Sequence, residues 1–198
     1  MRRFFTFVGI ILGFSGLSGM EKVIPVSQYK LITGIYNGNP VARLLIKVDL
    51  SVLPDNIRID GAEMRVSGIE LTGLDEGFTV ELHPLTRDWD PNTVSWTYPW
   101  ENPGGDYRGD IVSVISIPKD FSGTIGMDLT EIVGAWKNEI TNYGLLLKSP
   151  DFEGGGFNAE EMGILLNGIP TLNLKVYYSM RDTLRILSRE RGRKRAQR

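Results

Sequence analysis

The chain of 198 residues contains no cysteine and only one histidine, His83. The lack of cysteine excludes disulfides, thiol chemistry, cysteine-based zinc sites and a lipid anchor attached to an N-terminal cysteine. One histidine cannot supply a multi-histidine metal site. The folded protein must therefore be held together by packing, and its length suffices for one substantial apolar core.

Basic residues are also scarce in most of the chain. Residues 21–180 contain 12 basic and 22 acidic residues, a net charge of −10, whereas residues 181–198 contain eight basic and two acidic ones. A nucleic-acid groove needs clustered Lys and Arg to replace the counterions of the phosphates. The acidic body therefore argues against nucleic acid as a partner. It also disfavours a strongly anionic glycan, unless bound calcium or a local basic patch intervenes.

Residues 1–19 have the pattern of an export signal. A basic start, Met1-Arg2-Arg3, precedes an apolar run over residues 4–14 and a small-residue exit over 15–19. The run is shorter than the roughly 20 apolar residues that a membrane span needs. We therefore expect cleavage near Ser18 or Gly19, no transmembrane anchor afterwards, and a secreted or extracytoplasmic location, in the periplasm or at the cell surface.

The basic tail, residues 181–198, follows a module that we place at residues 20–180. One interpretation is a solvated tail that is disordered or helical. The other is an electrostatic tether to anionic lipid, a wall polymer or an envelope partner, since each basic residue near such a surface contributes about 1 kcal/mol.

Alternating apolar and polar residues predict many short strands in the module. In residues 42–50, Leu44, Ile46 and Val48 fall on one face while Arg43 and Lys47 fall on the other, the pattern of a half-buried strand. Gly, Pro, Asn and Asp clusters separate such runs, among them Asn37-Gly38-Asn39-Pro40. Further strands are expected within residues 62–66, 78–82, 111–117, 143–147, 163–166 and 172–178.

A single short helix is expected at residues 129–139. Leu129, Ile132, Val133 and Trp136 recur at three- and four-residue spacing, and Asp128 stands where it can cap the start. Trp136 therefore belongs to the packed face. Many strands and one short helix predict an all-β fold, which we expect to be an antiparallel two-sheet jelly-roll β-sandwich.

Five segments resemble, in order, the motifs of one known family. They are Arg43-Leu-Leu-Ile-Lys-Val-Asp-Leu-Ser-Val-Leu-Pro54, Asp88-Trp-Asp-Pro-Asn-Thr-Val-Ser-Trp96, Asp128-Leu-Thr-Glu-Ile-Val-Gly-Ala-Trp136, Asn142-Tyr-Gly-Leu-Leu-Leu-Lys-Ser149 and Pro170-Thr-Leu-Asn-Leu-Lys-Val-Tyr-Tyr178. The chain is similar in these segments to the DNRLRE domain, a disaggregatase-related family that resembles carbohydrate-binding modules. The resemblance implies a secreted, non-catalytic β-sandwich of the kind often attached to polysaccharide-active proteins.

Aromatic residues are the main candidates for sugar binding. An exposed ring offers a flat platform for the apolar C–H face of a sugar. Tyr98, Trp100 and Tyr107 lie in a Pro- and Gly-rich stretch, residues 98–109, where burial is hard to achieve and where loops commonly carry binding. Trp89 and Trp96 are instead expected to lie in the core or to clamp a loop. We expect hydrogen bonds to sugar hydroxyls from Arg87, Asp88 and Asp90.

The residues that could support catalysis or metal binding give weaker signals. His83 lies opposite Phe78, Val80 and Leu82 and precedes Pro84, which favours a surface or loop-anchoring role. Paired carboxylates such as Asp88 and Asp90 leave a two-carboxylate hydrolase open as an alternative.

A calcium site is the one cofactor to consider. Asp151 and Glu153, beside the glycines at 154–156, supply oxygen ligands in a loop that could wrap the ion.

The sequence favours a secreted, non-enzymatic module that binds polysaccharide through the aromatic loop. The alternative is a structural or adhesive scaffold of the cell envelope that is docked by its basic tail.

Overall fold

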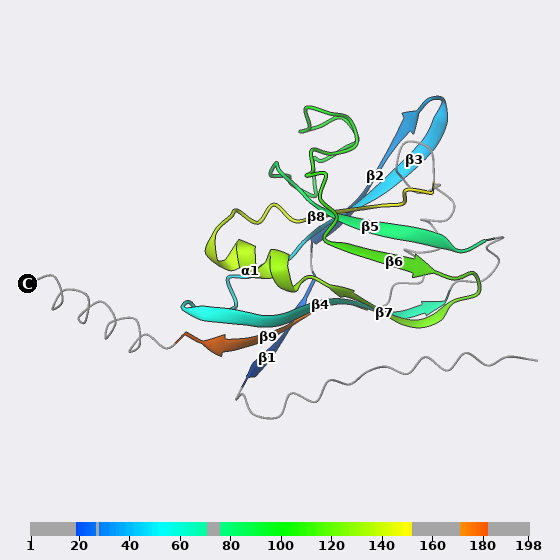
Figure 1. Ribbon diagram of the computed structural model, residues 1–198. Coiled ribbons are helices and arrows are strands. Elements are labelled where there is room, and N and C mark those ends of the chain that lie inside the picture. The colour runs from blue at the N-terminus through cyan, green and yellow to red at the C-terminus, as the bar shows by residue number, and fades with distance from the viewer. Residues whose placement is uncertain (1–18, 27, 71–75, 152–170, 182–198) are drawn as a thin grey trace, which may run out of the picture.

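The computed structural model describes residues 19–26, 28–70, 76–151 and 171–181. These residues form nine strands and one helix, and the strands make two antiparallel sheets that pack face to face (Figure 1). The predicted signal segment, the basic tail, the run at 163–166 and Glu153 lie outside the described residues. No helix in the described part of the chain is both long enough and apolar enough to cross a membrane.

The two sheets contain four and five strands. The four-stranded sheet has the order β1-β9-β4-β7 and consists of β1 (Met20–Pro25), β9 (Thr171–Met180), β4 (Ile57–Glu70) and β7 (Ser122–Asp128). The five-stranded sheet has the order β2-β3-β8-β5-β6 and consists of β2 (Gln28–Tyr36), β3 (Asn39–Lys47), β8 (Leu145–Lys148), β5 (Phe78–Pro84) and β6 (Ser113–Ile117).

The strand order is that of a jelly roll. The first strand pairs with the last, β1 with β9, and the inner pairs are β3 with β8, β4 with β7, and β5 with β6. One long antiparallel ribbon is thus rolled into two sheets. The remaining strand, β2, is an edge strand joined to β3 by the turn at Asn37 and Gly38, whose φ angles of 48° and 84° suit an Asn-Gly hairpin. The predicted jelly-roll sandwich is confirmed.

The main core lies between the sheets. Ala42, Leu44 and Ile46 of β3 point into it, opposite Met64 and Val66 of β4. The predicted helix is confirmed as α1 (Thr130–Asn138), which buries Ile132, Val133 and Trp136 against this core. Asp128 accepts hydrogen bonds from the backbone N–H and the hydroxyl of Thr130, so it satisfies one of the first N–H groups of the helix.

The outer face of the five-stranded sheet is covered as well. Val41, Arg43 and Leu45 of β3 point away from the main core and are nevertheless buried. The prediction that β3 is only half-buried is therefore wrong. The cover is a segment that we call the cap loop, residues 85–109, in the connection from β5 to β6 (Figure 1). It forms a second apolar cluster with the sheet, made of Ile32, Leu45, Leu85, Trp89, Val94, Trp100 and Leu146.

Candidate functional site: the cap loop

Backbone hydrogen bonds hold both ends of the cap loop beside the end of β5. Leu85 N–H donates to Gly144 O and Arg108 N–H donates to Pro84 O, over 3.0 and 2.9 Å. Thr86 N–H donates to Asp106 O over 2.9 Å, which joins the outgoing and returning parts of the loop. The cap loop is thus closed at its base, and its central part is placed by side chains.

Two buried tryptophans fix the central part. Trp89 is 5% exposed, and its Nε1 donates to Tyr143 O over 2.9 Å. This confirms the expected clamping role of Trp89. Trp100 is 7% exposed, and its Nε1 donates to Ser95 O over 2.8 Å. The expectation that Trp100 presents an exposed ring for sugar binding is wrong, because the second apolar cluster takes up the indole.

Trp96 and Arg43 form a second clamp. The Cζ atom of Arg43 lies 5.1 Å from the centre of the Trp96 ring and 5.6 Å from that of Tyr107, within the range of cation–π attraction. The Arg43 Nη1 donates to Gly104 O over 2.8 Å. The Trp96 ring also lies against Gly34 of β2, where any Cβ would stand 2.2 Å from the ring. Burial lowers the pKa of the Arg43 guanidinium from its ordinary value, but arginine remains charged in proteins.

A buried polar cluster lies beneath the returning part of the cap loop. His83 is 3% exposed, its Nδ1 lies 3.1 Å from Arg108 O, and its ring centre lies 4.9 Å from that of Tyr107. Its Nε2 is 3.3 Å from Glu81, which Lys148 also binds over 3.1 Å. Burial favours the neutral form of Glu81, but the hydrogen bonds from Lys148 and His83 outweigh it, so the pKa of Glu81 is lowered. Of the two roles expected for His83, the geometry corresponds to loop anchoring, and a surface position is wrong.

The cap loop carries a depression of about 560 Å³. Most of the residues that line it are polar, and they are Thr86, Arg87, Glu101, Asn102, Gly105, Asp106, Tyr107 and Gly109. Two of the six predicted sugar-binding residues, Arg87 and Tyr107, line it. Three further side chains, Glu101, Asn102 and Asp106, belong to it and were not predicted. The only sequence signal near them is the turn pattern Asn102-Pro103-Gly104-Gly105-Asp106.

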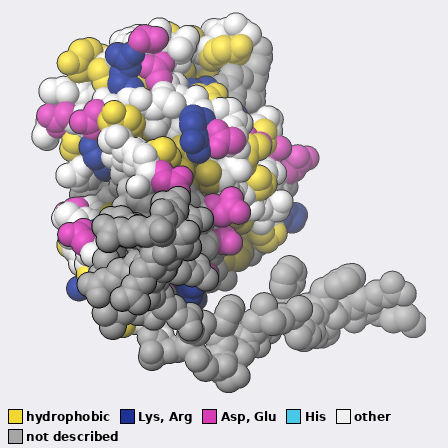
Figure 2. Space-filling view, turned by 60° about the vertical axis from the view of Figure 1, so that its left-hand side comes forward, with side chains coloured by type: hydrophobic (Ala, Val, Ile, Leu, Met, Phe, Trp, Pro, Cys, Tyr) yellow, Lys and Arg dark blue, Asp and Glu magenta, His cyan; other side chains and the backbone are white. Residues whose placement is uncertain are grey.

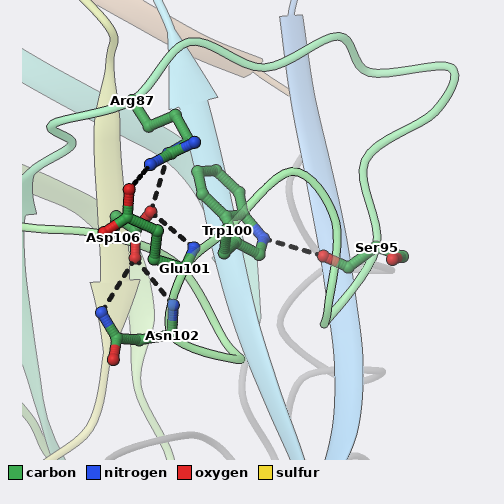
Figure 3. A network of polar contacts seen from close by, with 6 residues as sticks. All are labelled: Arg87, Ser95, Trp100, Glu101, Asn102 and Asp106. Atoms are coloured by element: carbon green, nitrogen blue, oxygen red, sulfur yellow. Dashed lines mark hydrogen bonds and ion pairs between the residues drawn. The ribbon is translucent and has the colours of Figure 1, made fainter.

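Asp106 organises the wall of the depression (Figure 3). Its carboxylate accepts hydrogen bonds from the backbone N–H groups of Glu101 and Asn102, over 2.9 and 3.0 Å, and from Nδ2 of Asn102 over 3.2 Å. Arg87 donates from Nε to Asp106 over 2.9 Å and from Nη2 to Glu101. Burial alone raises the pKa of Asp106, but these hydrogen bonds and the charge of Arg87 lower it overall.

The remaining predicted site residues do not line the depression. Tyr98 is 60% exposed on the cap loop. Asp88 accepts a hydrogen bond from Lys47 Nζ over 2.5 Å, which lowers the pKa of its carboxyl. Asp90 is exposed and accepts from the backbone N–H of Asn92, so it shapes a turn.

The calcium prediction rests on residues that are only partly described. Asp151 accepts a hydrogen bond from the backbone N–H of Thr79 over 2.5 Å, whereas Glu153 lies outside the described residues. In the described ranges, no group of three or more Asp, Glu or His side chains is arranged to hold a metal ion.

The charges on one face of the molecule are mixed (Figure 2). On the face shown in Figure 2, acidic and basic side chains are interspersed among the described residues, with apolar side chains scattered between them. This distribution differs from the continuous basic stripe that typically follows a nucleic-acid backbone.

No protein-family model matches the chain, and no curated protein matches it. The functional assignment therefore depends on the geometry of the cap loop.

Proposed function

We propose that this protein is a secreted, non-catalytic module that binds polysaccharide through the depression on the cap loop. The observation that carries this proposal is that Arg87, Glu101, Asn102, Asp106 and Tyr107 line one hollow of about 560 Å³. This volume lies within the range of about 300–1,000 Å³ that is usual for ligand sites. Hydroxyl-rich sugar rings suit such a lining, because planar polar side chains bind hydroxyls and a phenol face packs against C–H groups.

The lowered pKa of Asp106 supports binding rather than catalysis. A glycosidase needs one carboxylic acid that holds its proton near neutral pH, which requires a raised pKa. The pKa of Asp106 is lowered, and Asp106 accepts hydrogen bonds from Glu101, Asn102 and Arg87. Glu101, the other acid of the depression, is paired with Arg87. Asp106 and Glu101 therefore hold the neighbouring parts of the cap loop in place.

The family resemblance supports the same proposal. Two of the segments that resemble the DNRLRE domain supply residues that attach the cap loop to the sheet, namely Arg43 from the first segment and Trp89 and Trp96 from the second. The export signal and the extracytoplasmic location remain predictions from the sequence.

The experiment is a glycan array probed with the purified protein, followed by affinity electrophoresis on the polysaccharides that it retains. Glu101→Ala removes a largely exposed group of the depression without cutting into a core, and we expect its affinity to fall about tenfold, the effect of losing one to two hydrogen bonds. The matched control is Glu131→Ala, a change at an exposed position of α1.

Tyr98→Ala tests whether the exposed ring extends the site. Its control is Tyr29→Ala, since Tyr29 is 56% exposed and lies on the opposite face of the five-stranded sheet from the cap loop. Retention of no polysaccharide would refute the proposed function. Unchanged affinity in Glu101→Ala would place the binding site elsewhere.

A further inference from the structure

We infer that the depression selects uncharged glycans and rejects those that carry carboxylates, an inference that rests on the proposed function and names its ligand class. Among the described residues that line the depression, there is one cation, Arg87, and there are two acids, Glu101 and Asp106. Their formal charges sum to −1. The lining is therefore slightly acidic. Binding of a uronate would instead need a cation that can pair with its carboxylate.

Arg87 is already committed to these two acids. Its Nε donates to Asp106 over 2.9 Å and its Nη2 donates to Glu101. Recognition of a uronate by arginine uses two parallel N–H groups of the guanidinium, the geometry of a bidentate pair. An incoming carboxylate would share the guanidinium with Glu101 and Asp106 and would lie beside both acids, so like charges would oppose it. A sugar hydroxyl meets no such penalty, because it can donate a hydrogen bond to either acid.

The other described cations near the depression do not line it. Arg43 lies beneath the cap loop, against the rings of Trp96 and Tyr107, and donates to Gly104 O. Lys148 is paired with Glu81 in the buried polar cluster. Arg108 is paired with Asp110, and both line a separate hollow beside α1. None of these three side chains is among the residues that line the depression.

The test compares pairs of glycans with the same sugar configuration and linkage, in which one member carries a carboxylate at C6. The probes are galactan against polygalacturonate, mannan against polymannuronate, and glucan against polyglucuronate, each measured by isothermal titration or affinity electrophoresis. We expect the unaltered protein to prefer the uncharged member of any pair that it binds by about tenfold or more. Added NaCl should reduce this preference, because salt screens charge repulsion at an open site.

Glu101→Gln is the decisive variant. It removes one negative charge, leaves an amide that can still bind a hydroxyl, and replaces the ion pair with Arg87 by a weaker hydrogen bond to a neutral group. Affinity for the uncharged glycan should stay within about threefold, and the preference over the uronate should shrink about tenfold. The matched control is Asp60→Asn, which removes a carboxylate from the Arg58–Asp60 pair on the four-stranded sheet and should leave the preference unchanged.

The outcomes separate the inference from the proposed function. If neither the glycan array nor any of these pairs shows binding, the proposed function itself fails. If polysaccharide binds but the uronate is bound equally or better, only the charge selection is refuted. An unchanged preference in Glu101→Gln would also refute it, because the selection would then arise outside the depression.

Discussion

Arg43 in the middle of β3 donates a hydrogen bond to the carbonyl oxygen of Gly104 in the cap loop, over 2.8 Å. The two residues are far apart in the sequence, and the bond joins the sandwich to its cover from below. The same guanidinium lies against the rings of Trp96 and Tyr107. One buried cation thus holds three points of the cap loop, and the wall of the depression depends on it.

Replacing this cation tests the relationship directly. Arg43→Lys keeps the charge but loses the planar fork and the stacking, so we expect the free energy of unfolding to fall by about 1–3 kcal/mol. Urea unfolding followed by tryptophan fluorescence measures the loss. Arg58→Lys, an exposed change on β4, is the control. Equal stability of the two variants would show that Arg43 does not hold the cap loop.

The contact between Trp96 and Gly34 leaves no room for a methyl group. A Cβ on Gly34 would stand 2.2 Å from the indole, so Gly34→Ala must displace Trp96 or bend β2. We expect a loss of about 1–3 kcal/mol, the usual cost of overpacking, and a change in the near-ultraviolet circular dichroism. Gly109→Ala is the control, because a Cβ there would meet no neighbouring atom within 4 Å. A dichroism spectrum unchanged in Gly34→Ala would contradict the packing described here.

Trp100 and Tyr98 are close in sequence but should respond in opposite ways. Trp100→Ala empties part of the second apolar cluster and should cost about 3–5 kcal/mol. Tyr98→Ala removes an exposed ring and should change stability by no more than about 0.5 kcal/mol. Thermal or urea unfolding of the two variants checks this difference. Near-equal losses would mean that the cap loop does not bury Trp100.

Acid should loosen the cap loop through Asp106. The folded protein lowers the pKa of this carboxyl, so the ionised form stabilises the fold at pH values above the unfolded pKa of about 3.9. That contribution is lost as the pH falls through the lower, folded pKa. We therefore expect the near-ultraviolet signal to decline below about pH 4. Glu81 and Asp88 also have lowered pKa values and add to the decline.

Asp106→Asn isolates the share of Asp106 in this acid response. An amide cannot titrate, so the variant should be less stable at neutral pH and should show a weaker dependence on acid. An identical acid profile in the variant and the unaltered protein would assign the response to other carboxyls.

Most strands that form the main core could be predicted from the sequence, because apolar and polar residues alternate clearly along them. Leu44 and Ile46 enter the main core as the pattern indicates, and Asn37-Gly38 forms the expected turn. Strands β1, β2 and β7 were not predicted. They are edge strands, and β1 buries only Ile24 while β7 buries only Ile125 and Met127, so their patterns are weak.

The cap loop was harder to predict. The apolar members of the second cluster, such as Trp89, Val94 and Trp100, are irregularly spaced, so no period marks them as buried. The polar face of β3 also led to a wrong prediction. In the strand considered alone, a charged residue such as Arg43 predicts a solvent-exposed face. Arg43 is buried by the rings of Trp96 and Tyr107 and by the carbonyl group of Gly104, all from the cap loop. The pattern of residues in one strand cannot predict contacts with a distant loop.

The two apolar clusters have no residue in common, and the five-stranded sheet separates them. Side chains at alternate positions along β3 point toward the main core or toward the cap loop. Denaturation should therefore proceed through a partly folded species in which the cover has melted while the jelly roll persists. Residues 85–109 could then be redesigned to give the scaffold a new specificity while its main core is left unchanged.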